Sequence, residues 1–190
     1  MNDLGFRWVK HQVRWNEIER EKGEYVWWEI DRLARTCQDA NLYLLVSVVT
    51  SPNWARNTTE AEGPPANYQD FWNFLAEMAE RYDCDGTDDA PGSPCVHYWS
   101  FYAEPDNGDL GRAQAGKGYW GHNGAGFAAM LSQVSPAIHA ANPRAKVLIG
   151  GLAYDWFEEE GGPFVRSFLN DTLTALNTLS LIHISEPTRP

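Results

Sequence analysis

One glutamate in this sequence has the surroundings that acid–base catalysis requires. Glu104 directly follows the aromatic run Val96–Ala103 (VHYWSFYA), which has the composition of a buried strand. Pro105 disfavours a helical backbone for the residue before it, so we expect Glu104 to be extended at the end of that strand. A carboxyl group among these aromatic side chains would be partly desolvated and would keep its proton near neutral pH, as a general acid must. An ordinary turn carboxylate has the same sequence signature.

Tryptophan is unusually frequent, with 9 residues in the chain. Trp15, Trp54 and Trp120 fall in segments that follow strand-like runs. A flat aromatic face can stack on the C–H face of a sugar ring, so these three are candidate platforms for carbohydrate. Packing in the core is the alternative for each of them.

An acidic segment is the one candidate for cation binding. In residues 83–95 (DCDGTDDAPGSPC) four aspartates lie around Gly86, which resembles part of a calcium loop but lacks the EF-hand spacing and its final glutamate. Calcium is therefore kept as an alternative, and no metal site is predicted. Cys84 and Cys95 bracket the segment and could pair if the protein is exported, whereas Cys37 is expected to pack as a small apolar residue.

Other catalytic signatures are missing from the sequence. It contains no H-E-x-x-H motif for zinc, no G-x-S-x-G motif for an esterase nucleophile and no Walker-type loop for a nucleotide. No cofactor is therefore expected.

The candidate residues must be positioned by elements that alternate along the chain. The runs Leu42–Val49 (LYLLVSVV) and Ala145–Leu152 (AKVLIGGL) are almost continuously apolar, as are parallel strands that are buried on both faces. Phe6–Val13 and Val96–Ala103 are the other two strand-like runs. After each run, apolar residues recur at helical spacing: Ile30, Leu33, Ala34 and Cys37, then Phe71, Phe74, Leu75, Met78 and Tyr82, then Phe127, Leu131, Val134 and Ile138, and finally Phe164, Val165, Phe168 and Leu169.

Four strand–helix units predict an α/β fold. No G-x-G-x-x-G follows the first strand, which favours a partial (β/α)8 barrel, or TIM barrel, over a dinucleotide-binding sheet. In such a barrel the loops at the carboxyl ends of the strands build the active site. The candidate residues fall in those loops, and loops are also polar for other reasons.

The net charge of the chain limits the classes of partner that it could bind. Its 190 residues carry 15 Lys and Arg against 26 Asp and Glu, a formal net charge of −11. This argues against nucleic acid or an anionic membrane surface as a partner, because both would repel the chain. No apolar run approaches the ~20 residues that a membrane helix needs. Residues 1–10 carry no signal-peptide pattern, so the localisation stays open, with secretion from a bacterium as one alternative.

The last residues do not fit the alternating pattern. Residues 179–189 (LSLIHISEPTR) resemble the translation of a sequencing adapter, so we expect 1–178 to be a partial barrel domain and 179–190 a non-native tail. Four units would make about half of a barrel that typically has ~250 residues. Such a half leaves two sheet edges unpaired, and we expect poor stability of the isolated chain.

Several motifs together resemble the clan A retaining glycoside hydrolases, closest to families 5 and 39. The motifs are Trp8–Lys10, Arg14–Glu19, Tyr25–Asp31, Ser51–Ala55 and Tyr98–Asn107, and their order and spacing are more specific than any one of them. The resemblance implies that the chain carries strands two to five of a cellulase-type TIM barrel.

The resemblance also implies roles for particular residues. Glu104 matches the acid/base glutamate at the end of strand four, and the nucleophile glutamate at the end of strand seven would lie beyond this chain. Arg14 matches a strand-two arginine that helps to keep the nucleophile ionised. Asn107, in the same turn as Glu104, is a further candidate for binding substrate. Ala103 departs from the family, which has an asparagine there that bonds the sugar 2-hydroxyl.

The function predicted from the sequence is that of a fragment of a retaining glycoside hydrolase. It would cleave β-linked oligosaccharides or polysaccharides with Glu104 as acid/base, and the fragment alone would be inactive. The alternative is a non-catalytic TIM barrel that binds carbohydrate through its aromatic residues.

Overall fold

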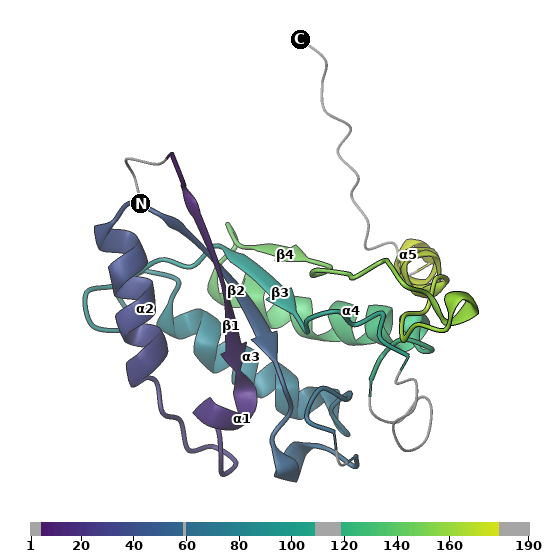
Figure 1. Ribbon diagram of the computed structural model, residues 1–190. Coiled ribbons are helices and arrows are strands. Elements are labelled where there is room, and N and C mark those ends of the chain that lie inside the picture. Colours follow the sequence, from purple (N-terminus) through teal and green to yellow (C-terminus); the bar gives the residue numbers. More distant parts are fainter. Residues whose placement is uncertain (1–4, 59, 109–118, 179–190) are drawn as a thin grey trace.

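The computed structural model describes residues 5–58, 60–108 and 119–178 and has an α/β fold (Figure 1). Its sheet has four parallel strands in the order of the chain: β1 (Trp8–Arg14), β2 (Tyr43–Val49), β3 (Tyr98–Phe101) and β4 (Lys146–Leu148). The predicted fold class is confirmed. The predicted tail, 179–190, lies outside the described residues.

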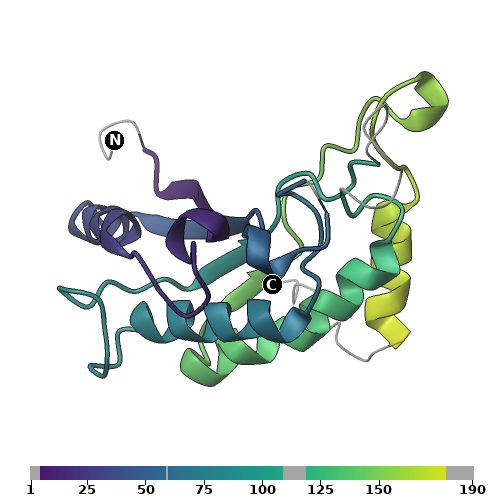
Figure 2. The same ribbon diagram turned by 90° about the horizontal axis from the view of Figure 1, so that it is seen from below.

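Helices alternate with the strands and cover one face of the sheet. Viewed from below, α3 and α4 run side by side under the strands, and α5 packs against α4 (Figure 2). The helical elements are α1 (Trp15–Ile18), α2 (Trp28–Asp39), α3 (Tyr68–Arg81), α4 (Gly124–Ala141) and α5 (Phe168–Thr178), with 3-10 turns η2 (Asn53–Ala55) and η3 (Glu158–Glu160).

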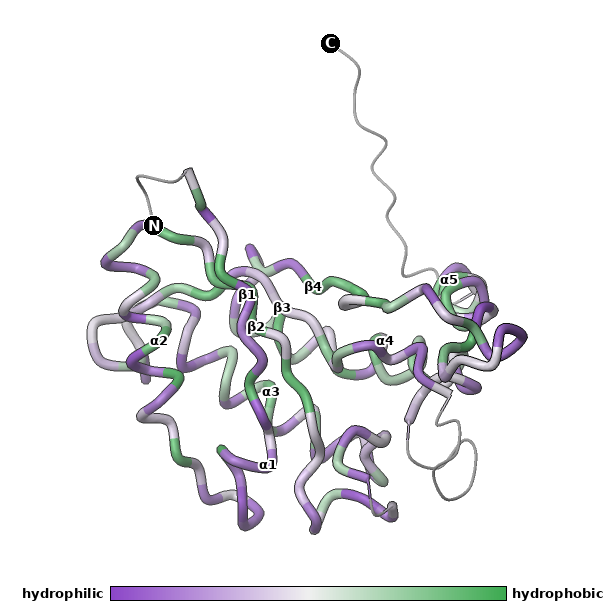
Figure 3. Tube along the Cα trace, in the orientation of Figure 1, coloured by the Kyte–Doolittle hydropathy of each residue, from purple (hydrophilic) through white to green (hydrophobic). Residues whose placement is uncertain are grey.

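The core lies between the sheet and these helices. Alternate strand residues such as Val46, Val48 and Phe101 are buried there. Because a helix has 3.6 residues per turn, the apolar stripes expected for α3 and α4 face the same layer, and Phe74 and Phe127 are fully buried in it. In Figure 3 the central strand β2 is mostly hydrophobic, whereas the loops beyond its carboxyl end are mostly hydrophilic.

The opposite side of the sheet, which we call the open face, is exposed at its amino end, whereas Ser47 and Ser100 nearer its carboxyl end are buried. At its amino end the rings of Trp8 and Tyr98 lie 4.5 Å apart, and those of Trp8 and Tyr43 lie 4.9 Å apart. Trp8 and Tyr43 are each half exposed, and Leu148 on β4 is also exposed. In a complete barrel the corresponding face is the packed interior, so the described residues form a partial barrel, as predicted.

Two strands end earlier than the apolar runs predicted. β3 stops at Phe101 because Tyr102 has a φ of 60°, and β4 stops at Leu148, two residues before Gly150 with a φ of 108°. Strict alternation would direct Tyr102 to the open face with Tyr98. Its left-handed backbone instead turns the side chain into the core, where its hydroxyl lies 3.3 Å from Ser51 Oγ.

The acidic segment before β3 lies at the amino end of the sheet. Cys84 and Cys95 form a disulfide there, with their Cα atoms 5.1 Å apart. Gln38 of α2 fixes this loop to the domain by donating to the Gly92 carbonyl and accepting from the Cys95 N–H. Cys37 is a free, buried thiol, as predicted.

Among the described residues, none of the helices combines the length and apolar character that crossing a membrane requires.

Candidate functional site

Glu104 occupies the turn that leaves β3 at the carboxyl end of the sheet. Its N–H donates to the Gly151 carbonyl at 2.9 Å, and Ala103 pairs with Gly151 in an isolated parallel bridge. The expected extended conformation is wrong, because Glu104 has a φ of 49°. The backbone leaves the extended region at Tyr102, whose N–H is held by the Val48 carbonyl of the neighbouring strand at 2.7 Å.

The expected desolvation of Glu104 is also wrong for this chain. Trp99, Phe101 and Tyr102 are buried on the helix side, whereas Glu104 is exposed. The aromatic strand therefore does not enclose the carboxyl group. Any group that shields it must come from outside the described residues.

Asp106 is a residue of this site that the sequence did not single out. It is buried, and its carboxylate accepts from the N–H groups of Ala153 at 3.1 Å and Tyr154 at 2.8 Å. Its own carbonyl accepts from the Val165 N–H at 2.8 Å. Asp106 thus joins the turn after β3 to the loop after β4. The joined residues are almost fifty positions apart, and no local pattern indicates the link.

Asn107 lies in the same turn and is half-buried. Its carbonyl accepts from the Gly121 N–H at 2.9 Å, and its backbone forms an antiparallel bridge with Phe164. Asn107 therefore remains near Glu104, as the sequence predicted, and its role in binding substrate stays a prediction.

Two of the three candidate tryptophan platforms are wrong. Trp15 is 0% exposed, stacks on Phe74 with ring centres 5.4 Å apart, and donates through Nε1 to Glu19 Oε2 at 2.6 Å. Trp120 is 1% exposed and packs edge-on against Phe127 at 5.2 Å. Because both rings are surrounded by core residues, neither presents a face to a ligand. Periodicity could not reveal this, because both lie outside the helical stripes.

Trp54 and Arg14 remain at the carboxyl end of the sheet. Trp54 is half-buried on η2, its Nε1 donates to the Glu19 carbonyl at 3.1 Å, and Lys22 Nζ lies 5.4 Å from its ring centre. Arg14, the last residue of β1, is exposed, and its Nε lies 3.9 Å from Glu17 Oε1. Their roles in binding stay predictions.

Glu19 is a second residue whose role the sequence does not reveal. It is buried and receives the indole N–H of Trp15, and its second carboxylate oxygen accepts from the Gly23 N–H at 2.8 Å. Burial, together with the charge of Glu19, raises the pKa of Tyr25 to about 12. Glu19 therefore organises the segment between β1 and α2 from within.

Lys10 brings a positive charge onto the open face. It alternates with Trp8 and Arg14 on the same side of β1. Its Nζ lies 3.0 Å from the position that a Cβ on Gly151 would take. Because the Gly151 carbonyl holds the Glu104 N–H, the ammonium reaches the neighbourhood of the Glu104 backbone from the far edge of the sheet. The alternation in β1 predicts on which face of the sheet Lys10 lies. It does not predict that the curvature of the sheet brings its ammonium group close to Gly151.

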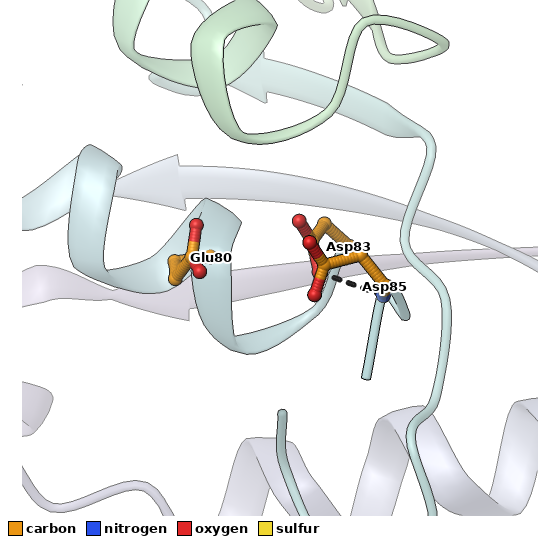
Figure 4. A group of neighbouring side chains, drawn as sticks. All are labelled: Glu80, Asp83 and Asp85. Carbon is orange, nitrogen blue, oxygen red and sulfur yellow. Dashed lines mark hydrogen bonds between the residues drawn. The ribbon is translucent and has the colours of Figure 1, made fainter. Parts of the chain in front are cut away.

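A separate acidic cluster is drawn in Figure 4, and two of its members flank the disulfide-bonded Cys84 in the sequence. Carboxylate oxygens of Glu80, Asp83 and Asp85 lie within 4.8 Å of one another. Asp83 is buried and accepts from the Asp85 N–H at 3.1 Å. Burial, reinforced by the negative charges of Asp85 and Asp89, raises the pKa of Asp83. Calcium is bound by carboxylate oxygens. If the chain binds calcium, as the sequence allows, this cluster is where it would bind, at the opposite end of the sheet from Glu104.

Comparison with known proteins supports the fold. No family model matches the sequence, and no curated protein matches it. Similar solved structures include a family 39 glycoside hydrolase from Bacteroides cellulosilyticus WH2, with a TM-score of 0.54 and 18% identity over 77% of this chain and 26% of that one. An exo-β-1,4-mannosidase from Opitutaceae bacterium strain TAV5 is similar with a TM-score of 0.56 and 21% identity, over 80% of this chain and 26% of that one. A family 10 endo-β-1,4-xylanase from Gloeophyllum trabeum is similar with a TM-score of 0.59 and 13% identity, over 93% of this chain and 51% of that one.

The chain spans between about a quarter and a half of the length of these structures. At these identities the likeness establishes the fold. The chain has the fold of part of the TIM barrel that these glycoside hydrolases share, and this confirms the predicted resemblance at the level of the fold.

Proposed function

We propose that this chain is part of a retaining glycoside hydrolase in which Glu104 is the acid/base. The observation that supports this most is the position of Glu104, in the turn after a parallel strand, at the end of the sheet where TIM-barrel enzymes carry their active sites. The likeness to glycoside hydrolases makes sugar chemistry the leading choice for that site.

In the proposed reaction Glu104 first donates its proton to the glycosidic oxygen as the C–O bond breaks. A second carboxylate, which we place on a strand that this chain does not contain, attacks the anomeric carbon and forms a covalent glycosyl intermediate. Glu104 then takes a proton from a water molecule, whose oxygen attacks the anomeric carbon. The bond to the second carboxylate breaks, and the sugar and the free carboxylate are released. The two carboxyl groups of a retaining enzyme lie about 5–5.5 Å apart, so the missing strand would also cover the exposed Glu104.

Cations on the open face suit this arrangement. Lys10 and Arg14 project from β1 toward the side on which the second carboxylate would lie. A nearby positive charge favours the ionised form of a carboxylate, which a nucleophile must have. We therefore assign Lys10, in addition to Arg14, to holding the nucleophile ionised.

We propose a β-linked polysaccharide or oligosaccharide as the substrate. Two of the similar structures are described as enzymes acting on β-1,4 linkages, a mannosidase and a xylanase. The Cys84–Cys95 disulfide is consistent with an oxidising compartment, and we propose that the protein is secreted.

The test is the change Glu104→Gln in a protein that continues this sequence through the remaining strands. With aryl β-glycosides that have poor leaving groups, kcat/KM should fall by about 10²–10⁴, because these substrates depend on general acid catalysis. Substrates with good leaving groups should lose less in the glycosylation step. The matched control is Glu29→Gln on the exposed face of α2, which should leave both rates unchanged.

Two results would overturn the proposal. Equal rates for the parent protein and the Glu104→Gln variant would remove the acid/base role. A parent that binds oligosaccharide but hydrolyses none of these glycosides would instead be a carbohydrate-binding barrel without catalysis.

A further inference from the structure

We infer that Tyr154 and Trp156 form a subsite that binds a pyranose unit of a β-linked oligosaccharide, on the rim of the site next to Glu104. The inference rests on the proposed function. Both residues lie in the loop between β4 and η3, which follows the carboxyl end of the sheet (Figures 1 and 2). No motif in the sequence singles out either residue.

The two rings are accessible to a ligand. Tyr154 is 54% exposed and Trp156 is 59% exposed, unlike Trp15 and Trp120, which are enclosed in the core. Large aromatic side chains lose stabilisation when they are left in water. Two of them within three residues of one loop therefore call for an explanation.

The backbone of this loop is held in a costly conformation. Tyr154 has a φ of 47° and Trp156 a φ of 42°, in the left-handed region that large side chains rarely adopt. Such conformations cost on the order of 1–3 kcal/mol each and persist where surrounding contacts impose them, often at ligand sites. Here the buried Asp106 carboxylate holds the Tyr154 N–H at 2.8 Å, and Asp155 Oδ1 holds the Trp156 N–H at 2.8 Å.

Packing under the rings fixes their position further. A Cβ on Gly162 would lie 1.7 Å from the Trp156 carbonyl oxygen and 2.5 Å from its Cγ, so only glycine fits beneath this residue. Tyr154 meets Phe157 edge-on, with ring centres 5.2 Å apart and an interplanar angle of 85°. The Arg166 guanidinium carbon lies 3.7 Å from the Phe157 ring centre, so the ring that supports Tyr154 is itself held.

The loop is next to the proposed acid/base. The Gly151 carbonyl accepts the Glu104 N–H at 2.9 Å, and Asp106, two residues after Glu104, bonds the N–H groups of Ala153 and Tyr154. A sugar chain that enters the site at Glu104 would therefore pass the two rings.

The chemistry of the loop fits a neutral sugar. Ring faces stack on the C–H face of a pyranose, and nearby carboxylates accept hydrogen bonds from its hydroxyl groups. Asp155 is exposed between the two aromatic residues, and Glu158 lies on the adjoining turn, paired with His122 at 2.9 Å. The acidic loop and the net charge of −11 disfavour an anionic ligand.

The experiment measures binding by the 190-residue chain, without catalysis. Cellohexaose, xylohexaose and mannohexaose are titrated by calorimetry into the unchanged chain and into Trp156→Ala and Tyr154→Ala variants. At least one hexasaccharide should bind, and each substitution should weaken it about tenfold or more. Trp28→Ala is the matched control, because Trp28 on α2 is 66% exposed but lies far along the chain from this loop. It should leave the affinity unchanged.

A further variant separates loss of the ring from loss of the fold. Trp156→Gly removes the ring and also relieves the left-handed strain, because glycine adopts positive φ freely. It should abolish ring-dependent binding while the melting temperature stays the same or rises. Trp156→Phe, which keeps an aromatic face, should retain most of the affinity.

The subsite is overturned if none of the three hexasaccharides binds, or if the Trp156 and Tyr154 variants bind as tightly as the unchanged chain. It is supported if binding depends on both rings and is unaffected by Glu104→Gln. The same binding result in a protein that proves unable to hydrolyse glycosides would overturn the proposed function and leave the subsite in place.

Discussion

The carboxylates in this chain have different roles, and the role of each depends on its burial and its hydrogen-bond partners. Glu19 and Asp106 are buried acceptors that hold an indole N–H and two backbone N–H groups, respectively. Glu104 is exposed in the turn after β3. A buried carboxylate with fixed donors is a structural element, whereas an exposed one at the end of a parallel strand is free to meet a ligand.

Asp83 is a buried carboxylate with an energetic cost. Its pKa is raised by burial and by Asp85 and Asp89, so the native state resists its ionisation more than the unfolded chain does. Above the unfolded value, near pH 4, the unfolded chain releases this proton first. Stability therefore falls as the pH rises through the folded pKa.

Removing that charge should stabilise the protein. We expect Asp83→Asn to raise the melting temperature at pH 7 in buffer with EDTA, by about 2–4 °C for each kcal/mol of relieved repulsion. The gain should shrink as the pH approaches 4. Asp88→Asn in the exposed part of the same loop is the control and should have little effect. A lower melting temperature for Asp83→Asn at pH 7 would contradict this account.

At the residue scale, the sequence predicted where Glu104 would lie but not its surroundings. A position after a strand is a local property, which the Tyr98–Asn107 motif already contains. The burial of Trp15 and Trp120 depends in part on Phe74 and Tyr68, which lie more than fifty positions from them along the chain. The role of Asp106 depends in the same way on a loop that follows another strand.

At the scale of elements, the order of strands and helices follows from local patterns. The apolar run in β2 and the stripes in α3 and α4 need no long-range information, and they were predicted. The end of β3 does not follow from them, because the left-handed residue Tyr102 is fixed by a hydrogen bond from its N–H to the carbonyl of Val48 on the neighbouring strand.

The loop between α3 and β3 is stabilised by its disulfide, and this can be tested. Cys84 and Cys95 are separated by 11 positions. Opening a loop of this length costs about 3 kcal/mol in the chain-entropy account. We expect the double variant Cys84→Ser, Cys95→Ser to lose about this amount in urea unfolding under oxidising conditions.

Reduction provides the control for that measurement. Dithiothreitol should lower the stability of the unchanged chain by a similar amount and should not affect the double variant. If both proteins respond equally to the reductant, the loss does not come from this disulfide.

At the scale of the whole molecule, the described sheet has two unpaired edges, β1 and β4, and an open face that carries Trp8, Tyr43 and Leu148. Unpaired strands and exposed apolar surface both favour association with other chains. We expect the 190-residue chain to form larger species as its concentration rises, measured by light scattering after size exclusion.

A charge on β4 should reduce this association. Leu148→Lys places a lysine on the exposed edge strand, whereas Leu173→Lys changes a similarly exposed leucine on α5 and serves as the control. Only the first should shift the chain toward the monomer. A chain that is monomeric at every concentration, or an equal effect of both changes, would mean that the open sheet does not drive association.

The hydrogen bonds of Asp106 also constrain how this protein can diverge. The Asp106 side chain connects the loop after β3 to the loop after β4, which belong to successive strand–helix repeats. A change in the length of one loop would therefore affect the other. An insertion or deletion between Tyr154 and Val165 would change the length of a loop whose two ends are both bonded to Asp106. Relatives of this chain should accommodate such changes only beyond that stretch. For directed evolution, libraries that vary side chains at positions 154 and 156 while keeping Asp106 and the loop length should yield more folded variants than libraries that vary the length.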